Sequence, residues 1–213
     1  MPKQLTLDVD SGINQAITIL KRGGIVAFPT DTVYGLGAGA YLPHAIEKVY
    51  QVKERPRKMA LPLLLADITQ ISEVSSEVPE VAWVLAESFL PGALTLVLSA
   101  AASVPSIVTA GGRTVAVRVP AHPVPMALVK GLGSPIVGTS ANISSGSSPI
   151  TADEVASQLG DRIDLIIDGG RCSGGESTIV DVTGVKPVII RQGAISWGTL
   201  KGVCPDIILR EDN

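Results

Sequence analysis

Four cationic side chains lie within the six residues 53–58, which read KERPRK. Arginine can fork onto two phosphate oxygens, and lysine binds phosphate as a point charge. Such a run is also typical of a solvated surface that complements the C-terminal dipole of a helix. Because Pro56 stiffens the chain and an apolar run at 61–65 follows at once, the cations would be held in place. We therefore expect Lys53-x-Arg55 to bind phosphate groups.

Small polar residues follow an apolar strand in the stretch 137–146, which reads VGTSANISSG. Loops of this kind offer backbone N–H groups and hydroxyls to an anion or to a sugar and base. A Ser- and Gly-rich surface loop is the alternative interpretation, and the density of serine suits it too. With the cations at 53–58, Ser140-x-Asn142 predicts a site for a nucleotide's phosphates.

The stretch 29–37, PTDTVYGLG, places two threonines and an aspartate directly after a short buried strand. Ligands of α/β sheets bind at strand ends, and Gly35 and Gly37 permit close backbone approach. An ordinary turn that uses Asp31 and Thr32 as caps explains the same residues equally well. From this stretch alone the two interpretations are even.

Isolated polar residues occur within or beside three β-branched runs: Arg118 in VAVRVP, Ser177 in STIVDV and Arg191 in VIIRQG. A buried arginine needs a partner. Arg118 and Arg191 are therefore expected either to pair with carboxylates such as Asp181 or to meet a ligand.

No conventional catalytic motif is present. His44 and His122 stand alone, outside any zinc pattern, and surface or capping roles suit both. The chain contains no phosphate-binding G-x-x-x-x-G-K-[ST] loop, no G-x-G-x-x-G before a helix and no G-x-S-x-G elbow. We expect no metal ligands from the protein. A site that makes or breaks phosphoanhydrides here would work by placement and charge stabilisation.

Helices and strands alternate along the chain, but without the even spacing of a doubly wound parallel sheet. An α/β fold with a twisted mixed β-sheet flanked by helices fits better. We expect one domain over 1–213, with a core of about 9–195 and an ambiguous tail at 196–213. The expected helices are 11–21 (N-cap Ser11), 43–53, 81–89 and 151–159; the expected strands are 25–28, 61–66, 94–98, 115–119, 136–138, 165–167, 179–182 and 188–190.

Bulk composition narrows the class of protein. The 213 residues are 46% hydrophobic but only 3% aromatic, so the core must be aliphatic. A net charge of −3 argues against nonspecific binding of nucleic acid as the main role. Cys172 and Cys204 fit two reduced thiols. The N-terminus lacks a signal-type apolar stretch, and a soluble cytoplasmic protein is expected.

Six of these stretches together resemble the YrdC/TsaC family, the L-threonylcarbamoyl-AMP synthases. They are FPTDTVYGLG at 28–37, K-x-R-P at 53–56, VAVRVP at 115–120, TSANISSG at 139–146, STIVDV at 177–182 and IIRQG at 189–193. They follow the family's order and cover nearly the whole chain. The resemblance implies a YrdC-like fold with a large concave cavity.

The resemblance also implies a reaction. Such enzymes condense L-threonine, bicarbonate or CO2 and ATP into threonylcarbamoyl-AMP and pyrophosphate, usually with Mg2+. The product serves N6-threonylcarbamoylation of adenosine 37 in tRNA, with transfer proteins of the TsaB, TsaD and TsaE type as partners. By motif, Lys53, Arg55, Ser140, Asn142 and Arg191 would bind ATP. Thr32, Arg118 and Ser177 would hold threonine, with Lys53, Arg55 and Arg118 as the catalytic candidates. Asp31 would orient its loop.

The chain departs from the family pattern in three places. The loop after Arg55 is longer and more basic, Ala66 stands where many relatives carry histidine, and the chain ends soon after Arg191, as in the short form of the family. An RNA-binding module without catalysis, in which cations at 53–58 contact tRNA, is the main rival hypothesis. A carbamoyl-adenylate domain of the hydrogenase-maturation type is a second rival, but the chain contains no CxxC pairs.

Overall fold

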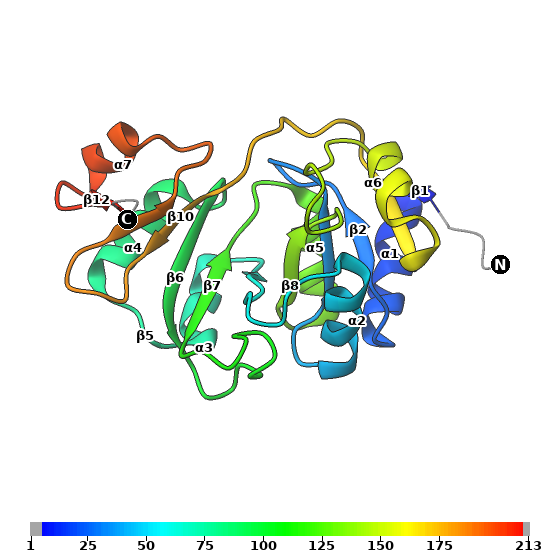
Figure 1. Ribbon diagram of the computed structural model, residues 1–213, viewed down its shortest axis with the longest axis horizontal. Coiled ribbons are helices and arrows are strands. Elements are labelled where there is room, and N and C mark those ends of the chain that lie inside the picture. Colours follow the sequence, from blue (N-terminus) through cyan, green and yellow to red (C-terminus); the bar gives the residue numbers. More distant parts are fainter. Residues whose placement is uncertain (1–5, 211–213) are drawn as a thin grey trace.

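A computed structural model describes residues 6–210, and a mixed sheet forms the framework of this part of the chain (Figure 1). The strand order is β1-β9-β2-β3-β8-β4-β7-β6-β10-β11-β12, with β5 paired to β6 in addition. Parallel and antiparallel pairs both occur: β2 runs parallel to β9 and antiparallel to β3. The expected fold class, a twisted mixed sheet flanked by helices, is confirmed.

The elements have the following bounds. The strands are β1 (Thr6–Asp8), β2 (Val26–Phe28), β3 (Gly35–Gly39), β4 (Leu63–Leu64), β5 (Ser75–Glu77), β6 (Leu94–Ala100), β7 (Thr114–Arg118), β8 (Ile136–Ser140), β9 (Leu165–Asp168), β10 (Thr178–Asp181), β11 (Val188–Arg191) and β12 (Ile208–Leu209). The helices are α1 (Val9–Lys21), α2 (Pro43–Lys53), α3 (Ile71–Val74), α4 (Glu80–Phe89), α5 (Pro123–Leu132), α6 (Ala152–Leu159) and α7 (Trp197–Val203), with 3-10 turns at Ile68–Gln70 and Gly160–Arg162.

Strand β3 was not expected, because its GLGAG sequence reads as a flexible loop. All five of its residues are buried, and it pairs antiparallel with both β2 and β8. The glycines make room for the ring of Phe28: a Cβ added at Gly35 or at Gly37 would lie 2.8 Å from that ring. Glycine therefore serves close packing within the sheet here, rather than a turn.

Two helices differ from the sequence-based expectations. Helix α1 starts at Val9, and its N-cap is Asp8, whose carboxylate accepts from the Ser11 N–H at 3.0 Å. The prediction of Ser11 as the cap is therefore wrong. Helix α5 was not expected from a segment with two prolines; Pro123 occupies its first turn, where a missing N–H costs nothing. His122 caps it by accepting from the Val124 N–H, a capping role in line with the expectation.

The stretch after Arg191 belongs to the same sheet. Strand β12 pairs in parallel with β11, and α7 packs near α4. Figure 1 shows these elements at the red end of the molecule, beside β10 and α4. The tail therefore extends the framework as far as residue 210; its last three residues lie outside the described part. No helix within residues 6–210 is long and apolar enough to cross a membrane.

Candidate active site

One cavity of about 490 Å³ collects the predicted site residues. Its walls come from the loop after β2, the end of α2, strands β3, β4 and β8, and strands β6, β7, β10 and β11. All eight residues singled out from the sequence line it: Thr32, Lys53, Arg55, Arg118, Ser140, Asn142, Ser177 and Arg191. The structure therefore brings together stretches that are far apart in the chain, while the role of each residue stays a prediction.

Lys53 ends helix α2 and is only 1% exposed. Its Nζ donates to Ser140 O at 2.6 Å, to Asn142 O at 2.7 Å and to Asn142 Oδ1 at 3.2 Å. Burial, with a smaller contribution from the charge of Arg55, lowers the pKa of Lys53 to about 7. None of the three acceptors carries a formal charge, so the ammonium rests on neutral oxygens alone.

Arg55 follows a helix end at which Glu54 adopts the left-handed conformation, with φ of 52°. Its Nε donates to Met59 O at 3.1 Å and its Nη2 to Ala60 O at 2.8 Å. These bonds brace the loop after Arg55. They leave the Nη1 group free of hydrogen bonds to the described part of the chain, on a side chain that lines the cavity.

The remaining cations of the 53–58 run do not join the cavity lining. Arg57 pairs with Glu47 and lies over the Tyr50 ring, 4.9 Å from its centroid. Lys58 is exposed. The charge run is therefore divided: Lys53 and Arg55 face the cavity, and Arg57 binds the flank of helix α2.

Arg118, at the end of β7, is 8% exposed and holds the loop after β2. Its Nη2 donates to Asp31 Oδ1 at 2.7 Å, its Nη1 to Thr32 Oγ1 at 3.0 Å and its Nε to Gly92 O at 3.0 Å. Burial lowers the pKa of Arg118, and Asp31 opposes that shift. Asp31 therefore orients Arg118 and its own loop.

The suggestion that Asp181 partners these arginines is wrong. Its carboxylate instead accepts from the N–H and the hydroxyl of Thr183 in the turn after β10. Arg118 finds Asp31, which is 87 positions away in sequence. Arg191 finds Glu176, at 2.7 Å.

Ser177 and Arg191 form the opposite wall. Arg191 donates from Nε and Nη2 to Ser177 O at 3.1 and 2.9 Å, and from Nη2 to Ser177 Oγ at 3.1 Å. The Ser177 hydroxyl also meets Thr95 Oγ1 at 2.8 Å. A serine hydroxyl, a threonine hydroxyl and a guanidinium are thus held next to each other on three neighbouring strands or their ends.

A glycine-rich segment, 169–175, ties the β2 loop in place. Gly174 N donates to Thr32 O at 2.8 Å, and Tyr34 OH donates to Gly170 O at 2.8 Å. Burial raises the pKa of Tyr34 to about 12, so the hydroxyl stays protonated as this donor. In Figure 1 the segment runs along the top of the molecule, from the half containing β2 to the half containing β10.

Sequence reasoning missed Glu176, the only carboxylate among the described residues of the cavity lining. It accepts from Ser148 Oγ at 3.2 Å and pairs with Arg191, so it joins a loop of one wall to a strand of the other. Its position next to Ser177 was the available signal. Thr95 was also missed; it lies within the apolar strand β6. Thr30, from the 29–37 stretch, lines the cavity too.

Ala66 does not line the cavity in the described chain. It is 5% exposed and packs with apolar residues, while its N–H donates to Gln70 Oε1 at 2.8 Å.

Among residues 6–210 no group of three or more His, Cys, Asp or Glu side chains could hold a metal ion. Cys172 and Cys204 are free and buried.

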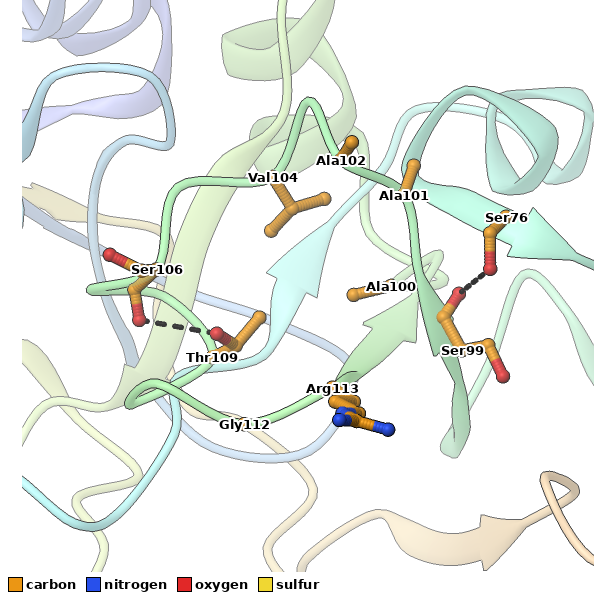
Figure 2. Close-up of a pocket in the computed structure, with 10 residues that line it drawn as sticks. All are labelled: Ser76, Ser99, Ala100, Ala101, Ala102, Val104, Ser106, Thr109, Gly112 and Arg113. Carbon is orange, nitrogen blue, oxygen red and sulfur yellow. Dashed lines mark hydrogen bonds between the residues drawn. The ribbon is translucent and has the colours of Figure 1, made fainter.

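A second depression of about 460 Å³ lies at the far end of β6 and β7, and its chemistry is different (Figure 2). Small side chains line it, and Arg113 is the only ionisable group that residues 6–210 contribute to the lining. Ser76 and Thr109, which Figure 2 shows with their hydrogen bonds, both donate to nearby backbone carbonyls. The site residues predicted from the sequence all lie in the first cavity, which we take as the candidate active site.

Known proteins resemble this chain over most of its length. A family model described as telomere recombination, Sua5/YciO/YrdC, matches residues 18–193, which include every lining residue named above. The chain belongs to the Sua5/YciO/YrdC family. Family members similar to it include the threonylcarbamoyl-AMP synthases of Pyrococcus abyssi, 41% identical over 92% of the chain, and of Bacillus subtilis, 43% identical over 91%.

Solved structures of the family share the fold. The crystal structure of Pyrococcus abyssi Sua5 complexed with L-threonine matches 97% of the chain with a TM-score of 0.93 and 38% identity. Escherichia coli YciO matches 93% of the chain with a TM-score of 0.82 and 30% identity. The chain spans 58% and 57% of the two synthases, 62% of the threonine-bound Sua5 and 98% of YciO.

Proposed function

We propose that this family member is an L-threonylcarbamoyladenylate synthase, a nucleotidyltransferase. The observation that carries the proposal is the charge distribution of the cavity: Lys53, Arg55, Arg118 and Arg191 line it against Glu176, the single carboxylate among the described lining residues. Such a cavity suits a ligand with several anionic groups. Two family members that match 92% and 91% of the chain bear the name of this activity, and a relative was solved with L-threonine bound.

In this proposal the two substrates contact different residues of the cavity. Arg55 and Ser140, on the α2 and β8 side, receive the ATP phosphates, with Arg191 facing them. Arg118, Thr32 and Ser177 receive L-threonine; the buried guanidinium of Arg118 suits its carboxylate, and the hydroxyls suit its polar groups. The support is positional, because all of these side chains line one cavity and Arg118 donates to Thr32 Oγ1 at 3.0 Å, so that these two residues can meet one ligand.

The reaction we assign has two steps. The threonine amine attacks CO2 and gives a carbamate with loss of one proton; starting from bicarbonate, the same C–N bond forms with loss of water. A carbamate oxygen then attacks the α-phosphorus of ATP, the α–β phosphoanhydride bond breaks, and pyrophosphate leaves. Negative charge grows on the pentavalent centre and on the leaving group, where Arg55 and Arg191 would offset it. A hydrogen bond to a charged group contributes about 1.5–3 kcal/mol, so losing Arg55 is expected to cost at least about tenfold in rate.

Mg2+ would enter with ATP as part of that substrate. The one lining carboxylate, Glu176, is already paired with Arg191, so the described chain offers no dedicated set of oxygen ligands. Mg2+ is commonly held by substrate phosphates, water and one or two carboxylates, and it needs no protein cage.

The product would feed formation of N6-threonylcarbamoyladenosine at position 37 of tRNA, in the cytoplasm, through transfer proteins of the TsaB, TsaD and TsaE type. Two unpaired buried thiols and a net charge of −3 suit a reducing compartment and an enzyme that need not grip RNA tightly. Direct contact with tRNA belongs to the rival hypothesis of an RNA-binding module. Arg57 and Lys58, on the outer face, are the residues that it would use.

Pyrophosphate release tests the proposal. The purified protein, given MgATP, bicarbonate and L-threonine, is expected to release pyrophosphate and form the adenylate, identified by mass spectrometry. Omitting threonine should abolish both. Threonine-independent release, or tRNA binding that persists at physiological salt in a protein that does not bind ATP, would overturn it. YciO has the same fold, so the fold alone does not identify a synthase. The pyrophosphate assay tests the activity itself.

A further inference from the structure

We propose that the K-x-R…S-x-N residues divide into two functional pairs: Lys53 with Asn142 positions the loop, and Arg55 with Ser140 contacts the nucleotide. Motif reasoning gave all four to the phosphates. The proposal rests on the nucleotide site proposed above and assigns different work to its residues.

The hydrogen-bonding capacity of Lys53 is fully used inside the protein. An ammonium group has three N–H donors, and three oxygens lie within 3.2 Å of Nζ: Ser140 O, Asn142 O and Asn142 Oδ1. The backbone carbonyl of Lys53 is used as well, since it accepts from Ser144 N at 2.9 Å. Lys53 thus holds the segment 140–144 through both its side chain and its main chain.

Asn142 is occupied in the same way. Its Oδ1 faces Lys53, and its Nδ2 donates to Ile143 O at 2.8 Å and to Gly146 O at 2.6 Å. The side chain is largely buried, with the residue 5% exposed. An amide with both ends bonded within its own loop has its donors committed there, so its role is to fix the shape of 142–146.

Arg55 and Ser140 differ from this pair. The Nη1 group of Arg55 makes no hydrogen bond to residues 6–210, and neither does the Ser140 hydroxyl, whereas both residues line the cavity. The helix end explains the split: Lys53 is the last residue of α2 and its ammonium bonds the 140–142 segment, whereas Arg55 comes after the left-handed residue Glu54. Lys53 therefore acts through the loop that presents Ser140.

The three oxygens around Lys53 Nζ are all uncharged carbonyl-type acceptors. Their arrangement should favour a lysine ammonium over an arginine guanidinium. Three oxygens arranged around one nitrogen suit a tetrahedral ammonium, while a guanidinium presents its donors as a planar fork. Lys53→Arg keeps the charge and is nevertheless expected to fail as a replacement. If Lys53 served as a point charge for phosphate, arginine would retain much of that function.

Hydrogen exchange of the ligand-free protein tests the division. Lys53→Met is expected to speed exchange of the amides in 139–147 by about tenfold or more, because the loop loses three bonds. Asn142→Ala should do the same, and Lys53→Arg should resemble Lys53→Met. Arg55→Met is the matched control, another cation of the cavity; its exchange in 139–147 should stay at the wild-type rate. No ATP or threonine is present, so the result does not depend on the proposed reaction.

A double-mutant cycle on ATP affinity completes the test. Lys53→Met with Asn142→Ala is expected to weaken ATP binding no more than either single change, because both open one loop; Lys53→Met with Arg55→Met should be close to additive. Unchanged loop exchange in Lys53→Met, restored affinity in Lys53→Arg, or additive losses with Asn142→Ala would each overturn the proposal. Should Lys53→Met not fold, Asn142→Ala carries the exchange test alone, and wild-type exchange in that variant overturns it.

Discussion

Arg118 and Asp31 form a largely buried ion pair of 2.7 Å between two segments 87 residues apart, the end of β7 and the loop after β2. The same guanidinium donates to Thr32, so the pair fixes two residues that we assign to threonine binding. A buried charge whose partner is removed is strongly destabilising.

Asp31→Ala is expected to lower the free energy of unfolding by about 3 kcal/mol, and to raise the KM for threonine more than the KM for ATP. Urea denaturation and steady-state kinetics measure the two effects. Asp181→Ala is a matched control, because that carboxylate caps only its local turn; its loss should be about 1 kcal/mol, with an unchanged KM. Equal losses in the two variants would contradict the structural role of the pair.

The sequence predicts the residues of the site but not the bonds between them. Strand ends and special residue types are local signals, and they are enough to indicate Lys53, Arg118 and Ser177. The partner of Arg118 is a long-range property: Asp181 lay on an expected strand, yet the partner is Asp31, in a loop after β2, and three strands separate β2 from β7 in the sheet. Glu176 was missed for the same reason, because its partners Ser148 and Arg191 come from two other segments.

The fold was predictable where the residue pattern agreed with the element formed. Helix α2 begins and ends at the expected residues, since Pro43 suits a first helical turn. Strand β3 and helix α5 were missed because glycine in a strand and prolines in a helix are locally unfavourable. Packing decides both: Phe28 needs the space over Gly35 and Gly37, and α5 buries apolar residues against the sheet beside α1.

Lys53 makes stability depend on pH. Its pKa falls to about 7 in the folded protein from an unfolded value of 10.5, so between these pH values the unfolded chain binds more protons. Stability should therefore rise with pH in this window, by at most about 1.4 kcal/mol per pH unit. Comparing urea unfolding of wild type and Lys53→Met at pH 7 and pH 9.5 isolates this effect, and the difference between them should shift in favour of wild type at the higher pH. A difference that does not change with pH would show that Lys53 titrates normally.

The Glu176 carboxylate pairs with Arg191 at 2.7 Å, where a phosphate of a bound ligand could otherwise bind. Because this carboxylate pairs with a cation that we assign to ATP, Glu176→Gln should remove a competitor and tighten ATP binding about three- to fivefold, measured by calorimetry. Glu47→Gln frees Arg57 in the same way but outside the cavity lining, and it should leave the affinity unchanged. Weaker ATP binding in Glu176→Gln would mean that the carboxylate supports the bound nucleotide instead.

The glycines of β3 affect both the stability of the sheet and the cavity, because Gly35 of this strand lines the cavity. A Cβ at Gly37 would lie 2.8 Å from the Phe28 ring and 3.0 Å from Val137 O, and neither can move without disturbing β2 or β8. Gly37→Ala is therefore expected to lower the free energy of unfolding by about 1–3 kcal/mol. Gly202→Ala, in α7, is the matched control: nothing lies within 4 Å of its added Cβ, and alanine favours a helix by up to about 1 kcal/mol. The melting temperatures of the two variants should thus shift in opposite directions.

Since β8 carries Ser140 at its end, Gly37→Ala should also lower ATP affinity, whereas Gly202→Ala should not. A stable, fully active Gly37→Ala protein would contradict this prediction. It would show that β2 and β8 can move enough to accept the added methyl group beside Phe28.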